Sequence, residues 1–415
     1  MRWKGRSFFT KLIAFFRIVF PEFIGLSSQP RAELESKSSE HQRLEGKEIG
    51  VGIGKDVKLL GGVGLLLLGC SSEAFAQSSV YISGFLGAGI GYTSNVAGHS
   101  SVSETNGVLR PNSFVMQGKE DLGGGLQALF YLGTLFSMDT GTILGAPGSL
   151  FSRESYVGLS NQYGTLTFGQ QRDFMFDMTV HGYAGGFNQG LWGAHQGPFP
   201  TFGVPYVIGG SYDFDRLNGE AVNNAVKFKS ANFSGMTFGA MYGFGGVAGH
   251  FGNSSSSSFT VNYEFGSGGV GAAYTMAKPP TINNGNDGIR NIGVGGKYLL
   301  APVQLSVLGT ISRNTGTGAQ IDAVDATVSY DVTPFWNFAT TYTYMGGNHV
   351  LDSAHANQVD ATLTYRLSKR TSVYGTYVWQ RASGKGALAR INSTQTSPSS
   401  SDAQTMVGIS IAHLF

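Results

Sequence analysis

The sequence predicts an all-β fold, a transmembrane antiparallel β-barrel of about 16 strands. The chain ends, from Thr405 to Phe415, in a strictly alternating segment that stops on an aromatic residue. Upstream, segments of about ten residues with period two recur between polar or Gly-rich turns, which is typical of barrel strands. The apolar run from Leu59 to Leu68 near the N-terminus is shorter than the roughly 20 apolar residues that a membrane helix needs.

That apolar run indicates export. Leu59 to Leu68 follows two lysines and precedes Ala74-Phe75-Ala76, which is the pattern of a secretory signal cut before Gln77. An alternative is that Leu67-Leu68-Gly69-Cys70 is a lipobox and that Cys70 becomes a lipidated N-terminus. A large residue directly before the glycine fits that alternative poorly.

Residues 1–50 differ from the rest of the chain in their charged and aromatic composition. They are either an unusually long leader or an upstream extension from a misplaced start codon, with translation beginning near Val51. We favour the extension. The expected organisation is therefore an extension of uncertain reality at 1–50, a signal peptide at 51–76 and a barrel at 77–415.

Excluding residues 1–76 changes the charge of the chain. They hold 11 of the 28 Lys and Arg and 8 of the 26 Asp and Glu, so the rest carries 17 basic and 18 acidic residues, a formal charge of −1 instead of +2. This balance gives no support for nucleic-acid binding, which calls for a clustered basic stripe. The only cysteine also leaves with the leader, and no cofactor or thiolate metal site is expected.

The clearest pair of strands lies between Gln358 and Arg381, with a turn at Ser368 to Thr371. In its first strand one face is apolar and the other polar: Val359, Ala361, Leu363, Tyr365 and Leu367 alternate with Gln358, Asp360, Thr362, Thr364 and Arg366. A soluble sandwich would show the same period. Tyr and Trp near the strand ends favour the aromatic girdles of a membrane barrel, which must close because hydrocarbon cannot pair an open sheet edge. A barrel of this size encloses an aqueous lumen.

Several motifs then resemble one family, the general diffusion porins of Gram-negative bacteria, and in particular the β-proteobacterial type. The motifs occur in the family's order and are Gly118 to Ala128, Phe151 to Leu159, Tyr163 to Gly169, Asn223 to Phe228 and the final His413-Leu414-Phe415. The resemblance implies a 16-stranded barrel in the cell outer membrane, usually a homotrimer, that passes small hydrophilic solutes and ions. It also implies contact with outer-membrane lipid and lipopolysaccharide, and a terminal Phe415 that the barrel assembly machinery reads.

The resemblance also assigns a pore constriction. In the family the third loop folds into the lumen, and its carboxylates face basic side chains on the wall. Here that loop follows Arg172, and Asp173 and Asp177 would supply the negative side of a transverse field. Each aspartate is alternatively a solvated loop carboxylate or a turn cap.

Basic positions on the wall match only in part. Arg153 and Arg216 stand where the family has basic residues, whereas Gln170 and Ser113 stand where it commonly has arginine. We therefore expect weak or cation-leaning selectivity. Two further lysines, Lys227 and Lys229, share one strand face and are either lumen residues or a surface pair.

Rival functions are a substrate-specific channel, a barrel enzyme and an adhesin-like barrel. An enzyme would need a nucleophile and a base, but the histidines are scattered over predicted loops and no Gly-x-Ser-x-Gly stretch occurs. No histidine spacing indicates a metal site. The segments Gly249 to Ser258 and Ala389 to Asp402 are expected to be exposed, mobile external loops.

Overall fold

The computed structural model describes residues 79–145, 148–181, 196–202, 221–391 and 397–415. The strands are β1 (Ser79–Val96), β2 (His99–Asn106), β3 (Asn112–Gly123), β4 (Leu126–Phe136), β5 (Ile143–Leu144), β6 (Glu154–Asn161), β7 (Gly164–Arg172), β8 (Ala221–Ser230), β9 (Met236–Gly243), β10 (Ser256–Phe265), β11 (Gly268–Ala277), β12 (Ile289–Leu300), β13 (Val303–Asn314), β14 (Gln320–Asp331), β15 (Trp336–Gly347), β16 (His355–Arg366), β17 (Thr371–Ser383) and β18 (Ala403–Leu414). The helical segments are α2 (Phe174–Phe176), η2 (Asp177–His181), η4 (Pro200–Phe202), η6 (Asn283–Gly285) and η7 (His349–Leu351).

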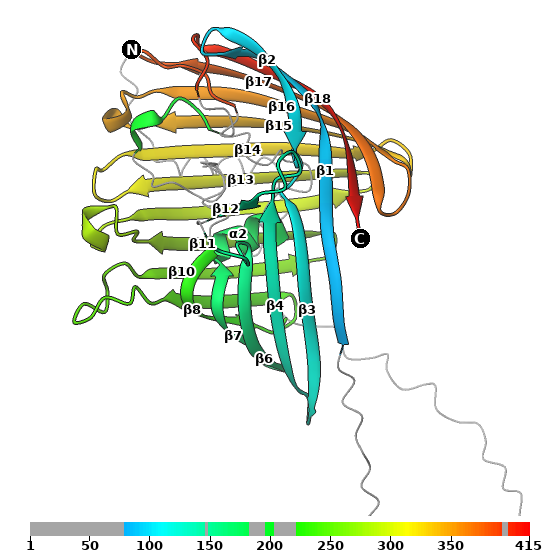
Figure 1. The fold of residues 1–415 in the computed structure, drawn as a ribbon, viewed down its shortest axis with the longest axis vertical. Coiled ribbons are helices and arrows are strands. Elements are labelled where there is room, and N and C mark those ends of the chain that lie inside the picture. The colour runs from blue at the N-terminus through cyan, green and yellow to red at the C-terminus, as the bar shows by residue number, and fades with distance from the viewer. Residues whose placement is uncertain (1–78, 146–147, 182–195, 203–220, 392–396) are drawn as a thin grey trace, which may run out of the picture. The chain divides into compact units, whose positions relative to one another are not determined.

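The strands form one antiparallel sheet that closes on itself, because β1 pairs with β18 from Phe85–Leu414 to Thr93–Met406 (Figure 1). β2 and β3 both pair with β1, over its second and first halves, so together they act as a single spanning strand. β5 contains only two residues. The barrel therefore has 16 spanning strands, and the predicted fold class is confirmed.

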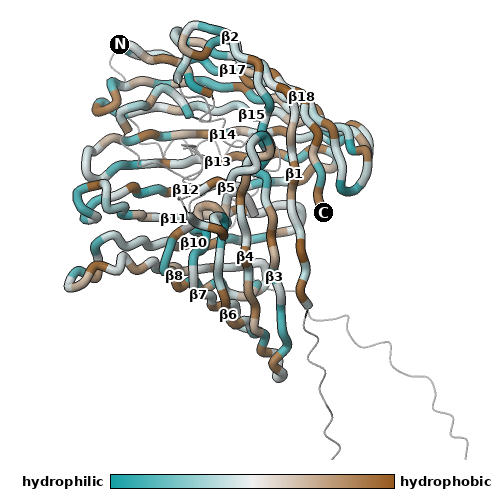
Figure 2. The backbone as a smooth tube through the Cα atoms, in the orientation of Figure 1, coloured by the Kyte–Doolittle hydropathy of each residue, from teal (hydrophilic) through white to brown (hydrophobic). Residues whose placement is uncertain are grey.

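Side chains alternate between the two faces of the sheet. Along β18, Ile409 is 62% exposed on the outside while Ser410 is 4% exposed on the inside. In β16 the same contrast holds between Leu363 at 46% and Asp360 at 2%. Figure 2 shows the resulting short bands of opposite hydropathy along the strands. The apolar face of each predicted strand therefore lies toward lipid, as the period-two pattern indicates.

The two ends of the barrel differ in their connections. Short turns join β3 to β4, β6 to β7 and β10 to β11, whereas the connections at the other end are mostly longer, apart from the turn between β1 and β2. In outer-membrane barrels the short turns are periplasmic and the longer loops are extracellular. The C-terminus lies at the short-turn end: the Phe415 amide donates to the Gly84 carbonyl at 3.2 Å, and the Gly84 amide donates to the Phe415 carbonyl at 3.1 Å.

Two loop expectations are wrong in part. The serine run does not end in a loop, because Ser256 to Ser258 already belong to β10 and Ser258 is only 1% exposed. In the connection before β18, Ala389 and Ile391 are fully buried. The reason is packing: Ile391 lies in an apolar cluster with Val378 and Met406.

No helix among the described residues is long and apolar enough to span a membrane. The expected extension at 1–50 and signal peptide at 51–76 lie outside the described residues.

Candidate functional site

The chain turns into the barrel immediately after β7. One carboxylate oxygen of Asp173 accepts the Phe176 amide at 2.9 Å and so caps α2, while its other oxygen accepts the Thr275 hydroxyl at 2.6 Å. The Phe174 amide donates to Ser258 Oγ at 2.9 Å. These contacts attach the start of the loop to the inner faces of β10 and β11.

Two glycines on the wall make room for this segment, which lies inside the sheet in Figure 1. A Cβ at Gly239 would lie 2.2 Å from Phe174 Cζ, and one at Gly293 would lie 2.5 Å from Met175 Cε. Any larger side chain at Gly239 would collide with a rigid ring. The loop therefore enters the lumen along a path of small residues on β9 and β12.

A second described part of the same loop, residues 196–202, also contacts the wall. The Asn314 side chain donates to the Phe202 carbonyl at 3.0 Å, and the Gly197 amide donates to the Arg390 carbonyl at 3.0 Å. Phe199 and Phe202 share an apolar cluster with Met178, among others. The inward-folded loop expected from the resemblance is thus present in its described parts.

Lys227 joins β8 to the base of the loop. Its ammonium lies 2.7 Å from Asp177 Oδ2, donates to the Arg172 carbonyl at 2.7 Å, and lies 4.6 Å from the centre of the Phe174 ring. The Lys227 side chain is 10% exposed and the Asp177 side chain is 22% exposed. Lys227 therefore points inward and is paired. Lys229 follows it on the same face and is exposed.

Burial distinguishes the two predicted aspartates. Asp173 is 2% exposed, and desolvation raises the pKa of its carboxyl to about 7, against the opposing effect of its bonds from Thr275 and Phe176. Burial therefore disfavours the charged form of the Asp173 carboxyl. The sequence left open whether each aspartate is a helix or turn cap or a carboxylate of the constriction. Asp173 has the contacts of a cap, and Asp177 has the more exposed side chain.

Arg153 lies on the neighbouring wall, just before β6. Its amide donates to the Gly133 carbonyl at 3.0 Å and its side chain bonds the Tyr131 hydroxyl. The Arg110 guanidinium interacts electrostatically with Arg153 and lies 4.3 Å from the centre of the Phe85 ring. Two arginines from separate connections thus meet on one part of the wall.

Glu154 lies among these basic groups. Its Oε2 accepts the Arg172 amide at 3.3 Å, and its charge interacts with Arg172, Lys227 and Arg153. Arg110, Glu154 and Arg172 belong to the site but are not among the residues expected from the sequence. Glu154 and Arg172 each adjoin an expected residue in the chain, which is a usable signal, whereas Arg110 is brought in by the break between β2 and β3.

The remaining positions singled out in the sequence are Ser113, Gln170 and Arg216. Ser113 is buried on the inner face of β3, and a bulge in β7 lies between Gly169 and Gln171, beside Gln170. Arg216 lies outside the described residues. Arg153, Asp177 and Lys227 therefore lie around one part of the lumen, while the contribution of Arg216 stays a prediction.

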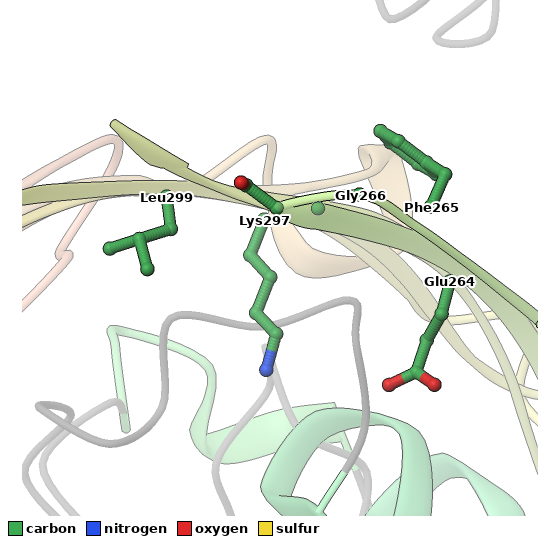
Figure 3. Close-up of a pocket in the computed structure, with 7 residues that line it drawn as sticks. Glu264, Phe265, Gly266, Lys297 and Leu299 are labelled. Atoms are coloured by element: carbon green, nitrogen blue, oxygen red, sulfur yellow. The ribbon is translucent and has the colours of Figure 1, made fainter. Parts of the chain in front are cut away.

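A separate hollow of about 430 Å³ lies near the short-turn end. Glu264 and Lys297 project from one side of the sheet there, and Phe265 projects from the other (Figure 3). The Glu264 carboxylate accepts the Asn232 amide at 3.3 Å. Side chains of both charge signs therefore line this hollow.

Comparison with known proteins agrees with this geometry. A family model described as Gram-negative porin matches residues 64–385. Outer membrane porin protein 32 of Delftia acidovorans is 26% identical over 379 residues, covering 85% of this chain and 99% of that protein.

Solved structures share the fold. An anion-selective porin from Comamonas acidovorans has a TM-score of 0.66 at 21% identity, covering 82% of this chain and 100% of that one. OmpT of Vibrio cholerae, in a trimer form, has a TM-score of 0.57 at 14% identity, covering 81% and 99%. A closed barrel of 16 strands with an inward-folded loop, matched over most of its length, identifies a channel for passive diffusion. The chain belongs to the family of Gram-negative porins and is a multi-pass protein of the outer membrane.

Proposed function

We propose that this porin is weakly charge-selective and that the base of the inward-folded loop sets its selectivity. The observation that carries the proposal is the Lys227–Asp177 pair at 2.7 Å, which places both signs of charge where the loop leaves the wall. Arg153 supplies the facing basic side, and Arg216 is proposed to add to it. Asp173 is proposed to shape the constriction by anchoring α2.

The basic groups around this region incline the expected selectivity toward anions. Arg110, Arg153, Arg172 and Lys227 interact with one another or with Glu154, while Asp177 is paired with Lys227 and burial raises the pKa of Asp173. The anion-selective porin from Comamonas acidovorans supports the same sign. This differs from the weak or cation-leaning selectivity expected from Gln170 and Ser113, because Arg110 and Arg172 add positive charge near those positions.

Planar-bilayer recordings in a salt gradient test this proposal. Arg153→Ala should shift the reversal potential toward cations, and Asp177→Asn should shift it toward anions. Single-channel conductance should change less than selectivity, because neither substitution removes the loop backbone that sets the bore.

The matched control is Asp287→Asn, which removes a carboxylate from an exposed loop. Its effect should fade as the screening length falls from about 10 Å at 0.1 M salt to about 3 Å at 1 M, while the lumen substitutions should keep theirs. Equal shifts for Asp177→Asn and Asp287→Asn at every salt concentration would remove Asp177 from the constriction.

Membership of the porin family also suggests partners for this chain. We propose that the chain assembles as a homotrimer, in line with the trimer form of the Vibrio cholerae relative by fold. We also propose contacts with lipopolysaccharide and with the barrel assembly machinery, and small hydrophilic solutes and ions as the transported species.

The mature protein is proposed to begin at Gln77, after removal of the signal peptide and of any residues before it. Mass spectrometry of the N-terminal peptide from purified outer membranes should find Gln77 first, because Ala74-Phe75-Ala76 fits a signal-peptidase site. An acylated N-terminus at Cys70, or peptides from residues 1–50, would contradict this assignment.

A further inference from the structure

Two arginines face each other directly across neighbouring strands on the barrel wall. In the register of β12 with β13, Arg290 is the partner of Arg313. Both are next to the long-loop ends of their strands, which begin at Ile289 and end at Asn314. Directly opposed residues in an antiparallel pair have Cβ atoms about 5 Å apart, so the two side chains share one patch of surface.

That patch is on the outside of the barrel. The flanking residues of β12, Ile289 and Asn291, are 2% and 0% exposed and face inward. Ser312 of β13 is also fully buried, and its hydroxyl accepts the Asn291 side chain at 2.9 Å. Since successive side chains alternate across a sheet, Arg290 and Arg313 point outward.

The charges of this pair are poorly neutralised. Like charges directly opposite each other destabilise a sheet. Within the described part of the chain, neither guanidinium has an ion pair or a hydrogen bond. The acid on the adjoining outer face is Asp322 of β14, which is the partner of Ile311 and therefore diagonal to Arg313. Its carboxylate already accepts the Gln320 amide at 2.9 Å.

Charged groups in the adjoining loops do not reverse this excess. The Lys278 ammonium donates to the Gly252 carbonyl at 3.3 Å and adds positive charge at the end of β11. The Asp287 carboxylate accepts the Asn283 side chain at 2.7 Å and the Thr315 hydroxyl at 2.9 Å. The Lys278 charge offsets that of Asp287. Arg290 and Arg313 exceed Asp322 in charge, so the local charge is positive and suits an external anion.

The position of the Arg290–Arg313 pair along the strands indicates which kind of anion it would bind. Directly below the pair, Ile292 faces Ile311, so the outer faces of β12 and β13 become apolar within one step, with Asp322 of β14 beside Ile311. Near the long-loop end of β9, the Tyr242 ring stacks on Phe251 at 5.3 Å and meets Phe244 edge-on at 5.2 Å. Aromatic clusters of this kind mark the boundary between hydrocarbon and headgroups.

We propose that Arg290 and Arg313 together bind a phosphate group of an outer-leaflet phosphorylated glycolipid. Two guanidinium forks on one patch can donate to several oxygens of one phosphate, and a doubly charged phosphate monoester would neutralise both. The acyl chains of the same lipid would then cover the isoleucines below. Arg290 and Arg313 would thus be residues of the lipopolysaccharide contact proposed above. This proposal depends on the orientation of the barrel in the outer membrane and does not depend on the proposed ion selectivity.

The test is equilibrium binding of fluorescent diphosphoryl lipid A to the refolded mature barrel in detergent. The double variant R290Q/R313Q should bind it about tenfold or more weakly than the parent protein. Lipid A stripped of its phosphates should bind both proteins alike. The double variant should keep its heat-modifiable folded form and the parent's single-channel conductance, which separates a failure of this site from a failure of the channel proposal.

A matched control, R366Q/R370Q, removes the same charge at the short-turn end of the barrel. Equal weakening in that control would show unspecific attraction and overturn the proposal, as would equal binding by the parent and R290Q/R313Q. Inorganic phosphate is the probe for a free-anion site. Full displacement of lipid A by millimolar phosphate would assign the site to a free ion, whereas persistence of the bound lipid supports the lipid assignment. The double variant R290K/R313K keeps both positive charges but loses the planar guanidinium groups. Its affinity for lipid A is expected to lie between those of the parent protein and R290Q/R313Q.

Discussion

Replacing Lys227 with methionine should loosen the base of the inward-folded loop. The substitution keeps a long side chain next to the Phe174 ring but leaves the Asp177 carboxylate and the Arg172 carbonyl without their ammonium partner. Removing one partner of a buried ion pair costs about 3–5 kcal/mol, and the partial exposure of Asp177 reduces the expected cost to about 2 kcal/mol. In bilayers the variant should show noisier open-channel current, and limited proteolysis should cut the loop faster.

Lys229→Met is the matched control, because Lys229 lies two residues further along the same strand face and is exposed. This substitution should change neither the noise of the open-channel current nor the rate at which protease cuts the loop. If Lys229→Met and Lys227→Met behave alike, the pair with Asp177 does not hold the loop. In the double variant Lys227→Met with Asp177→Asn, the loop should recover part of its resistance to proteolysis, since no unpaired carboxylate remains.

Deleting Phe415 should remove most of the assembled protein from the outer membrane. In vivo, the resemblance assigns the terminal aromatic residue to recognition by the assembly machinery. In detergent refolding the loss should be small, because the residue contributes two backbone bonds to Gly84 that are worth about 1 kcal/mol each. The amount of heat-modifiable barrel in membrane fractions, compared with the yield of in vitro refolding, separates the two effects.

Phe415→Tyr retains an aromatic ring and serves as the control, with assembly expected near the parent level. Wild-type amounts of folded protein in the deletion variant would show that Phe415 is not the signal. A Cβ at Gly84 would lie 2.3 Å from Phe415 Cζ, so Gly84→Val should displace the ring while keeping its chemical identity. Normal assembly of Gly84→Val would indicate that the ring is read before the barrel closes.

Most of the fold could be predicted from the sequence, because a lipid-facing strand is recognisable from the alternation of its own apolar and polar residues. Leu363 and Ile409 are exposed and Asp360 and Ser410 are buried inside, as period two requires. The same local rule failed at Ser258, whose position in a serine run suggested a loop. Its hydroxyl instead holds the start of α2, a contact between residues 84 positions apart that no local pattern contains.

The candidate site could be predicted only through family resemblance, and then only in part. Arg153, Asp177 and Lys227 lie near one another at the start of the loop, and their role in the constriction stays a prediction. The sequence did not distinguish Asp173 from Asp177. That distinction depends on Thr275, which is 102 residues away from Asp173 and donates to its carboxylate. Burial of a loop carboxylate is decided by which strand it meets.

The sequence by itself determined that this chain is a closed barrel of short alternating strands, because each strand must present an apolar face to hydrocarbon and every backbone amide must find a partner. Only the tertiary structure decided which charges share a surface. The pairing of β3 with β4 and of β4 with β6 brings Arg110 near Arg153, and the register of β12 with β13 sets Arg290 opposite Arg313 on the outside. Register is a long-range property, since a shift of one residue in the pairing of β12 with β13 would move the side chains of the shifted strand to the other face.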